Sequence, residues 1–261
     1  MDKQAQQLLD IAREAGRAIL GVYHQDFAVE HKDDQSPLTA ADLASHRVIA
    51  QRLGEIDPEI PILSEEGADI PFAERRGWAR YWLIDPLDGT REFVKRNGEF
   101  TVNIALIDGG RAVAGVVHVP VTGISYLGQL EQGAWKVDGE GVATEIRVNA
   151  SRPARLRVAG SRSHAGDSLK RFLERVGDHE IVSMGSSLKL CLVAEGSADV
   201  YPRLGPTSEW DTAAAQAVVE AAGGRVTDTQ LQPLRYNTKE SLLNPHFLVF
   251  GDSSEDWGRY L

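Results

Sequence analysis

The chain has 261 residues, of which 42% are hydrophobic and 25% charged, and it is long enough to bury a sizeable core. Acidic residues outnumber basic ones by 38 to 28. This balance argues against a nucleic-acid polymer as partner, because binding a phosphate backbone requires clustered Lys and Arg. With a single cysteine, Cys191, no intrachain disulfide can form. We also expect neither a signal peptide nor a membrane span, because no apolar run approaches the ~20 residues that a span needs.

The first part of the chain predicts two helices followed by strands. Apolar residues recur at helical spacing over residues 3–23, and a second helix is expected over 39–53. Pro58 and Pro61 then interrupt the chain. Asp108-Gly109-Gly110 separates two strand-like segments, which predicts a β-hairpin. The expected strands are 81–84, 101–107, 111–119, 124–127 and 134–137.

Beyond about residue 150, strand-like and helix-like segments alternate, as is typical of an α/β layer. The expected elements are 156–159, 169–176, 181–184, 188–195, 199–201, 212–222, 225–227 and 247–250. We therefore expect an N-terminal α+β lobe with an antiparallel sheet over residues 1–150, and a C-terminal α/β lobe over 151–261. The segment 70–80 has no evident role.

The most informative stretch is Asp85-Pro86-Leu87-Asp88-Gly89-Thr90, directly after an expected strand. Its two carboxylates lie three residues apart across a turn, with a backbone carbonyl between them. Hard divalent cations such as Mg²⁺ prefer carboxylate and carbonyl oxygens. The stretch is therefore a candidate metal site. A plain surface turn is the alternative, because Asp, Pro and Gly are common turn residues.

Three further acidic positions fit the same chemistry. Glu65 ends a short strand, Asp42 lies just inside the second helix, and Asp211 precedes the helix expected from residue 212. Each also has a purely structural explanation. Asp211 fits a helix N-cap, Thr39 and Asp42 fit a capping box, and Glu65 fits a solvated loop. Spacing alone does not show whether the four acidic sites meet in space.

Two of these motifs resemble the signatures of the lithium-sensitive inositol monophosphatase superfamily. Residues 82–90 resemble its first signature, and 210–214 followed by 221–224 resemble its second. The Glu65–Glu66 pair and Thr39…Asp42 stand in the expected order. Ala215 departs from the pattern, because the second signature usually has Gly there. Its methyl group either crowds the neighbouring backbone or improves helix propensity.

Within that superfamily the chain is most similar to the bacterial bisphosphate nucleotidases, and the likeness extends over nearly the whole chain. It is carried by residues 91–103, 161–164, 185–189 and 201–203. The resemblance implies a layered αβαβα sandwich of the sugar phosphatase and inositol monophosphatase type. It also implies inhibition by Li⁺, a role in sulfur assimilation, and a cytoplasmic location, with peripheral association with the bacterial inner membrane as the alternative.

The reaction implied is hydrolysis of the 3′-phosphate of adenosine 3′,5′-bisphosphate to AMP and phosphate by metal-activated water, without a covalent intermediate. By resemblance, the Mg²⁺ ligands are Glu65, Asp85, the Leu87 carbonyl, Asp88 and Asp211. Thr90 resembles the hydroxyl that orients the attacking water, held by Asp42, and Glu65 is also counted as catalytic. Two Mg²⁺ ions are implied, and a third near Asp42 is left open.

The substrate contacts implied by the resemblance lie partly in the second lobe. Arg203 and Lys189 resemble residues that bind the second phosphate, and Ser161 and Ser186 resemble residues near the base or phosphate. Gly89 leaves backbone amide and space for the phosphate. The full implied substrate set is Glu65, Leu87, Asp88, Gly89, Thr90, Ser161, Ser186, Lys189, Arg203 and Asp211.

Other functions stay open at this point. An inositol monophosphatase proper would share the metal ligands and differ in the substrate lobe, and a sugar-bisphosphate phosphatase is a further variant. Residues 186–189 fit the S-x-x-K motif of serine acyl-transferring enzymes, but the accompanying motifs are absent from the sequence. A degenerate, non-enzymatic binding protein would be expected to lack a ligand, whereas every acidic position is present.

Overall fold

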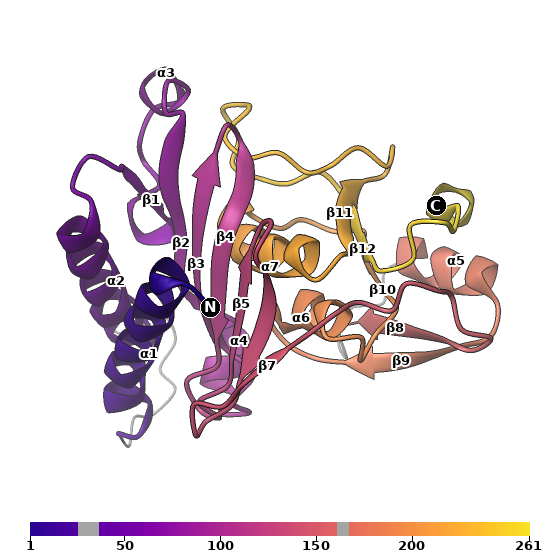
Figure 1. Ribbon diagram of the computed structural model, residues 1–261, viewed down its shortest axis with the longest axis horizontal. Helices are drawn as coiled ribbons and strands as arrows, with labels where there is room; N and C mark the ends of the chain where they lie inside the picture. Colours follow the sequence, from indigo (N-terminus) through magenta and orange to yellow (C-terminus); the bar gives the residue numbers. More distant parts are fainter. Residues whose placement is uncertain (26–36, 161–166) are drawn as a thin grey trace.

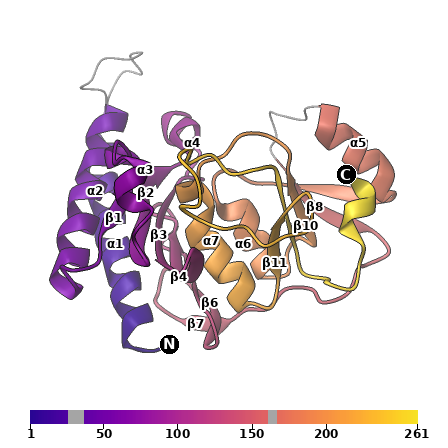
Figure 2. The same ribbon diagram turned by 90° about the horizontal axis from the view of Figure 1, so that it is seen from above.

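The computed structural model describes residues 1–25, 37–160 and 167–261, in which helices and sheets form alternating layers (Figure 1). The helices are α1 (Lys3–Tyr23), α2 (Pro37–Ile56), α3 (Phe72–Arg75), α4 (Thr90–Val94), α5 (Asp167–Val176), α6 (Leu188–Ala194) and α7 (Glu209–Ala221), with short 3-10 helices η1 (Glu65–Gly67) and η2 (Trp257–Tyr260). The order α1/α2, sheet, α6/α7, sheet, α5/η2 is also visible from above (Figure 2). This confirms the expected αβαβα class.

The outer helices α1 and α2 cover one face of the first sheet. Helix α1 has the bounds predicted from its periodicity, and the Asp2 carboxylate caps it by accepting from the Ala5 amide at 2.9 Å. Helix α2 begins at Pro37, two residues before the predicted start, and proline is well tolerated in the first turn of a helix. Thr39 and Asp42 therefore lie inside the helix, so the capping-box interpretation is wrong.

The first sheet has seven strands in chain order, with β1 parallel to β2 and all later pairs antiparallel. Its strands are β1 (Ile62–Ser64), β2 (Arg80–Asp88), β3 (Thr101–Asp108), β4 (Arg111–His118), β5 (Ser125–Gln129), β6 (Gly133–Val137) and the unpredicted β7 (Ala143–Glu145). The predicted hairpin is confirmed: Gly109 and Gly110 have φ of 54° and 73°, which a tight β3–β4 turn requires.

Both faces of this sheet are buried, which explains why its central strands read as continuous apolar runs. Alternate residues point to opposite faces. Trp82 and Ile84 of β2 belong to the core under α1 and α2, whereas Tyr81 and Leu83 belong to the core shared with α6 and α7. The first sheet is thus held between two helical layers.

Helix α7 packs unusually close to the first sheet because two strand positions lack a side chain. A Cβ at Gly115 would lie 2.4 Å from the Ala214 carbonyl oxygen, and one at Gly128 would lie 2.3 Å from the Val218 Cα. Ala215 is fully buried in this helix. The close approach fixes the position of α7, and with it the start of the helix that carries Asp211.

The second sheet has five strands in the order β11-β12-β10-β8-β9, with mixed directions. Its strands are β8 (Leu156–Gly160), β9 (His179–Ser183), β10 (Val200–Arg203), β11 (Arg225–Asp228) and β12 (Phe247–Phe250). All eight elements predicted beyond residue 150 are present, with small shifts of their ends. The proposed lobe division near residue 150 falls between the two sheets, yet α7 from the second part covers the sheet of the first. Among the helices of the described part, none has the length and hydrophobicity of a membrane span.

Candidate active site

Asp85 and Asp88 lie on a bulged end of β2 rather than on a turn after it. Asp85 pairs with Asn103 and Asp88 pairs with Thr101, so β2 carries an extra residue between these two pairs. Pro86, which has no amide hydrogen to donate, is accommodated at this irregularity. The Asp85 Oδ1 accepts from the Leu87 amide at 3.1 Å, and the Ser45 hydroxyl of α2 donates to the Pro86 carbonyl at 2.7 Å. The bulge lets both carboxylates approach the same point, with an oxygen of each within 4.8 Å of the other.

The start of α6 holds the Asp88 carboxylate in place. Asp88 Oδ2 accepts from the Ser187 amide at 2.6 Å and from the Ser186 hydroxyl. Thr101 contacts the same group, because its hydroxyl lies 2.8 Å from Ser186 Oγ and 3.5 Å from Asp88 Oδ2. Ser186 has a φ of 52°, which non-glycine residues seldom adopt. The second lobe thus orients a carboxylate of the first.

Asp211 reaches the site from the first turn of α7. It is the N3 residue of a capping box: the Ser208 amide donates to Asp211 Oδ2 at 2.9 Å, and the Ser208 side chain accepts from the N3 amide. The helix begins at Glu209, so the interpretation of Asp211 as an N-cap is wrong by three residues. One carboxylate oxygen caps the helix, and the carboxyl as a whole still faces Asp85 and Asp88.

Asp85, Asp88 and Asp211, here called the carboxylate cluster, each offer an oxygen within 4.8 Å of the others. Asp85 is 1% exposed, and its Oδ2 has no hydrogen-bond partner in the described part of the chain. Burial is the larger cause and repulsion from Asp88 the next, and together they raise the pKa of Asp85 well above its usual value and the pKa of Asp211 to about 7. A buried, unpartnered carboxylate oxygen facing two further carboxylates fits a hard divalent cation.

Glu65 and Asp42 lie beside this cluster. Glu65 begins η1 and lies within hydrogen-bonding reach of Asp85. Asp42 is buried on α2, within the same reach of Glu66, and its Oδ1 has no partner among the described residues. Burial, followed by the charge of Glu66, raises the pKa of Asp42 to about 8. The structure therefore brings all four acidic sites of the sequence to one region.

Thr90 is placed differently from the other candidates. It is exposed at the first position of α4, and no hydrogen bond joins it to Asp42 in the part of the chain that is described. Gly89 before it has a φ of 90°, and a Cβ there would lie 3.2 Å from the Phe100 Cα. Gly89 thus satisfies both a conformational and a steric requirement. The catalytic role of Thr90 and the ligand role of the Leu87 carbonyl stay predictions.

A cavity of about 600 Å³ opens between the two sheets, next to the carboxylate cluster. Asp88, Gly89 and Asp211 line one part of it, and Ser186, Lys189 and Arg203 line another. Lys189 is 8% exposed; its Nζ donates to the Ser186 carbonyl at 2.7 Å and the Met184 carbonyl at 3.3 Å. Arg203 donates to the Pro206 carbonyl at 2.8 Å and the Thr207 hydroxyl at 3.3 Å.

Both cations keep donor capacity for a ligand. An ammonium carries three donors and a guanidinium five, and each side chain uses two of them in the bonds just described. Burial lowers the pKa of Lys189, while the nearby Asp88 opposes that effect. The cavity therefore combines a metal-type cluster with fixed cations, an arrangement suited to a small polyanion. Ser161, also predicted at the substrate, lies outside the described residues.

Comparison with known proteins identifies the family. A model of the inositol monophosphatase family matches residues 1–252. The chain belongs to the inositol monophosphatase family. It is 53% identical over 246 residues to 3′(2′),5′-bisphosphate nucleotidase CysQ of Escherichia coli O6:H1, covering 93% of this chain and 98% of that protein.

Solved structures of the same family share the fold of this chain. CysQ from Bacteroides thetaiotaomicron, described as a bacterial member of the inositol monophosphatase family, matches 95% of this chain and 97% of its own, with a TM-score of 0.85 and 42% identity. An inositol monophosphatase from Zymomonas mobilis shares the fold, with a TM-score of 0.77 at 22% identity. Members of this family use Mg²⁺, and the carboxylate cluster of this chain is suited to bind it.

The segment 70–80 gains a function that its sequence did not reveal. Arg75 at the end of α3 is 2% exposed and donates to the Asn237 side chain and to the carbonyls of Lys239 and Glu240. The backbone N–H of Asn237 in turn donates to the carboxylate of Glu209, the first residue of α7, at 2.8 Å. Because Asp211 lies two residues further, this segment positions the start of the helix that carries it.

Three positioning residues were not singled out from the sequence. Ser187 and Thr101 hold Asp88, and Asn244 donates to the Ser208 carbonyl at 2.8 Å and to the Thr212 hydroxyl at 3.0 Å. Ser187 stands in a segment that resembles the nucleotidases, so its position was marked although its role was not. Thr101 likewise stands in such a segment, 91–103, whereas Asn244 carries no sequence signal of its own, because its importance follows from tertiary neighbours.

Proposed function

We propose that this protein is a Mg²⁺-dependent 3′(2′),5′-bisphosphate nucleotidase that removes the 3′-phosphate of adenosine 3′,5′-bisphosphate and yields AMP and phosphate. The observation that supports it most is the joint lining of one 600 Å³ cavity by Asp88, Asp211, Lys189 and Arg203. A monophosphate needs only the metal side of this cavity. The additional buried lysine and the arginine favour a substrate with a second phosphate.

The metal ligands in this proposal are Asp85, Asp88 and Asp211, with Glu65 and the Leu87 carbonyl completing the set. The chemistry that bound Mg²⁺ supplies is Lewis-acid catalysis, which lowers the pKa of water and neutralises charge on the leaving oxygen. We include two ions, and a third beside Asp42 is consistent with the unpartnered Asp42 Oδ1.

The protein's own groups bind and orient the substrate. Gly89 lines the cavity and is proposed to offer its backbone amide to the scissile phosphate. Lys189 and Arg203 donate to the second phosphate from the opposite side of the cavity. Asp42 and Thr90 are proposed to orient the attacking water, and this requires the exposed Thr90 hydroxyl to turn toward Asp42 when the substrate is bound. A cytoplasmic location, with peripheral membrane association as the alternative, belongs to the same proposal.

The test measures phosphate release from adenosine 3′,5′-bisphosphate and from inositol 1-phosphate, each with Mg²⁺ and with EDTA. We expect Mg²⁺-dependent turnover with a strong preference for the nucleotide. A preference for inositol 1-phosphate would keep the metal site and overturn the substrate assignment. A folded, Mg²⁺-binding sample that releases phosphate from neither would overturn the proposed function.

A further inference from the structure

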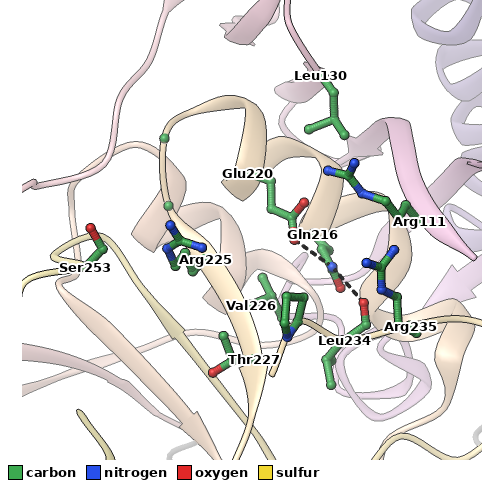
Figure 3. Close-up of a pocket in the computed structure, with 13 residues that line it drawn as sticks. Arg111, Leu130, Gln216, Glu220, Arg225, Val226, Thr227, Leu234, Arg235 and Ser253 are labelled. Carbon is green, nitrogen blue, oxygen red and sulfur yellow. Dashed lines mark hydrogen bonds between the residues drawn. The ribbon is translucent and has the colours of Figure 1, made fainter. Parts of the chain in front are cut away.

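A second pocket, of about 330 Å³, lies at the carboxyl end of α7, whereas Asp211 lies at its amino end (Figure 3). Its wall includes the guanidinium groups of Arg111, Arg225 and Arg235, together with Glu220 and Gln216 of α7. Figure 3 shows Arg111 and Arg235 on one side of Glu220 and Arg225 on the other. We call this the arginine pocket.

Among the described residues, the three arginines have no ion-pair partner. In the described ranges of the chain, none of their guanidinium groups forms a hydrogen bond or a salt bridge within 4.0 Å, although all three act electrostatically on Glu220. Three guanidinium groups and one carboxylate leave two positive charges around the pocket, on a chain whose net charge is −10. All three arginines are exposed and line the hollow, so their donor N–H groups are available to an anion that enters it.

Glu220 lies among these arginines but forms no ion pair with them within 4.0 Å in the described part of the chain. Its Oε1 accepts instead from the Gln216 side-chain amide at 2.8 Å, one helical turn away. Leu130, Val226, Pro233 and Leu234 add apolar surface to the wall. The pocket can therefore hold both the charged group and the carbon body of a small organic anion.

A buried chain of hydrogen bonds leads from this pocket to the large cavity. Gln216 bonds to Glu220, the Tyr236 hydroxyl donates to Gln216 Oε1 at 2.6 Å, and the same hydroxyl lies 3.2 Å from Thr212 Oγ1. Tyr236 is 1% exposed. Thr212 follows Asp211 and lines the large cavity. Both ends of α7 are thus connected by side chains as well as by the helix itself.

We propose that the arginine pocket binds a small organic dianion carrying a phosphate or sulfate group, and that its occupancy alters turnover through the Glu220–Gln216–Tyr236–Thr212 chain. Guanidinium groups match tetrahedral oxyanions through paired donors, and three of them around one hollow suit a doubly charged group.

Sulfate is the probe, because it is tetrahedral and dianionic and is not hydrolysed. Metal-free ¹⁵N-labelled protein is titrated with sodium sulfate, and a sodium chloride titration of equal ionic strength is the control. We expect saturable shifts of the amides of Val226 and Thr227, with a Kd on the order of millimolar. The double variant R225Q/R235Q should weaken binding in this pocket at least ~10-fold, because two charge-assisted contacts are lost. R76Q, which removes an exposed arginine elsewhere, should leave it unchanged.

The coupling has a readout in the same spectra and another in kinetics. The Thr212 amide should shift with sulfate in the wild type but not in Y236F, which keeps the pocket shifts. Under Mg²⁺, sulfate should change kcat of the wild type about 2–5-fold at saturating substrate, and leave kcat of R225Q/R235Q unchanged. Sulfate competing in the large cavity would raise KM in both proteins and is distinguished in this way.

Three results would overturn the proposal. Shifts that do not saturate, or equal binding by wild type and R225Q/R235Q, would show that the pocket is not a site. Saturable binding with no response of Thr212 or kcat would refute the coupling. A protein that lacks phosphatase activity would refute the proposed function, while the spectra would still decide whether the pocket binds.

Discussion

Asp88→Asn is the substitution with the most informative signature, because the structure predicts opposite effects on stability and on activity. An asparagine can place its oxygen where Asp88 Oδ2 accepts from the Ser187 amide at 2.6 Å and from the Ser186 hydroxyl. The local fold should therefore survive. What disappears is one negative charge of the carboxylate cluster.

The size of the effect follows from the spacing of the cluster. Two unit charges 4.8 Å apart repel by about 3 kcal/mol at an effective dielectric constant of ~20. The metal-free protein avoids part of this cost by raising the pKa values of Asp85 and Asp211. We therefore expect the variant in EDTA at pH 8 to gain about 1–3 kcal/mol of unfolding free energy, which is roughly 3–10 °C in Tm for a chain of this size.

With Mg²⁺ bound, the wild type should be more stable to unfolding than Asp88→Asn. A ligand at 100 times its Kd stabilises a protein by about 2.7 kcal/mol, and a site that has lost a charged ligand gains much less. Turnover should fall at least ~10³-fold. Thermal unfolding in EDTA and in Mg²⁺, together with phosphate release, measures all three quantities. Asp108→Asn, which removes an exposed carboxylate, is the matched control for net charge.

The reasoning fails if Asp88→Asn is less stable than the wild type in EDTA while Asp108→Asn is unaffected, because the cluster would then not be under repulsion. Near-wild-type turnover would refute Asp88 as a metal ligand. Lower stability in EDTA together with lost activity would indicate that Asp88 acts mainly through its bonds to α6.

Three further predictions test other parts of the molecule. Arg203→Ala should lower kcat/KM for adenosine 3′,5′-bisphosphate about 10–100-fold and leave kcat/KM for inositol 1-phosphate nearly unchanged. Steady-state kinetics on both substrates measure this, and equal losses on both would contradict a role of Arg203 at the second phosphate. Burial, and to a smaller extent the charge of Arg13, lowers the pKa of His118 to about 4 from its unfolded value of ~6.5. The neutral imidazole therefore contributes up to about 3 kcal/mol of stability above pH 6.5, and this contribution is lost as the pH falls toward 4. Denaturant unfolding at pH 7 and pH 4.5 should therefore show a smaller acid loss in His118→Asn, and an equal loss in both proteins would contradict this. Gly128→Ala should lower the free energy of unfolding by at least about 1–3 kcal/mol, because its methyl group would meet the α7 backbone. Gly54→Ala is the control: it lies in α2 with open space around it, so denaturant unfolding should show no change or a gain of up to about 1 kcal/mol.

Periodicity predicted the elements of this fold well where local pattern and tertiary role agree. The run 247–250 is an interior strand with the predicted bounds, because four consecutive buried apolar residues leave few alternatives. The end of β2 was harder. Asp85-Pro86 looks like the end of a strand, yet pairing continues to Asp88 because a bulge absorbs the proline. Pairing across a bulge depends on β3, a separate strand, and cannot be read from the residues of β2 alone.

The candidate site shows a similar division. The resemblance marked Asp85, Asp88 and Asp211 by position, and the structure brings their oxygens within 4.8 Å of one another. Sequence could not reveal why Asp88 is held by Ser187, or why Arg75 matters to the start of α7, because both depend on contacts across about 100 residues or more. Thr90 shows the converse, since a strong motif position is exposed and lacks a bond to Asp42 in the described residues.

Helix α7 links these observations, because it serves three parts of the molecule at once. Its first turn presents Asp211 to the carboxylate cluster, its middle lies against Gly115 and Gly128 of the first sheet, and its last turns present Gln216 and Glu220 to the arginine pocket. A helix held this closely by backbone contacts cannot bend locally without moving along the sheet. Small displacements at one end should therefore be transmitted to the other. That close packing keeps Asp211 beside the two carboxylates of β2 despite their repulsion, and it is also the property that would let an anion at the far end of α7 influence the carboxylate cluster.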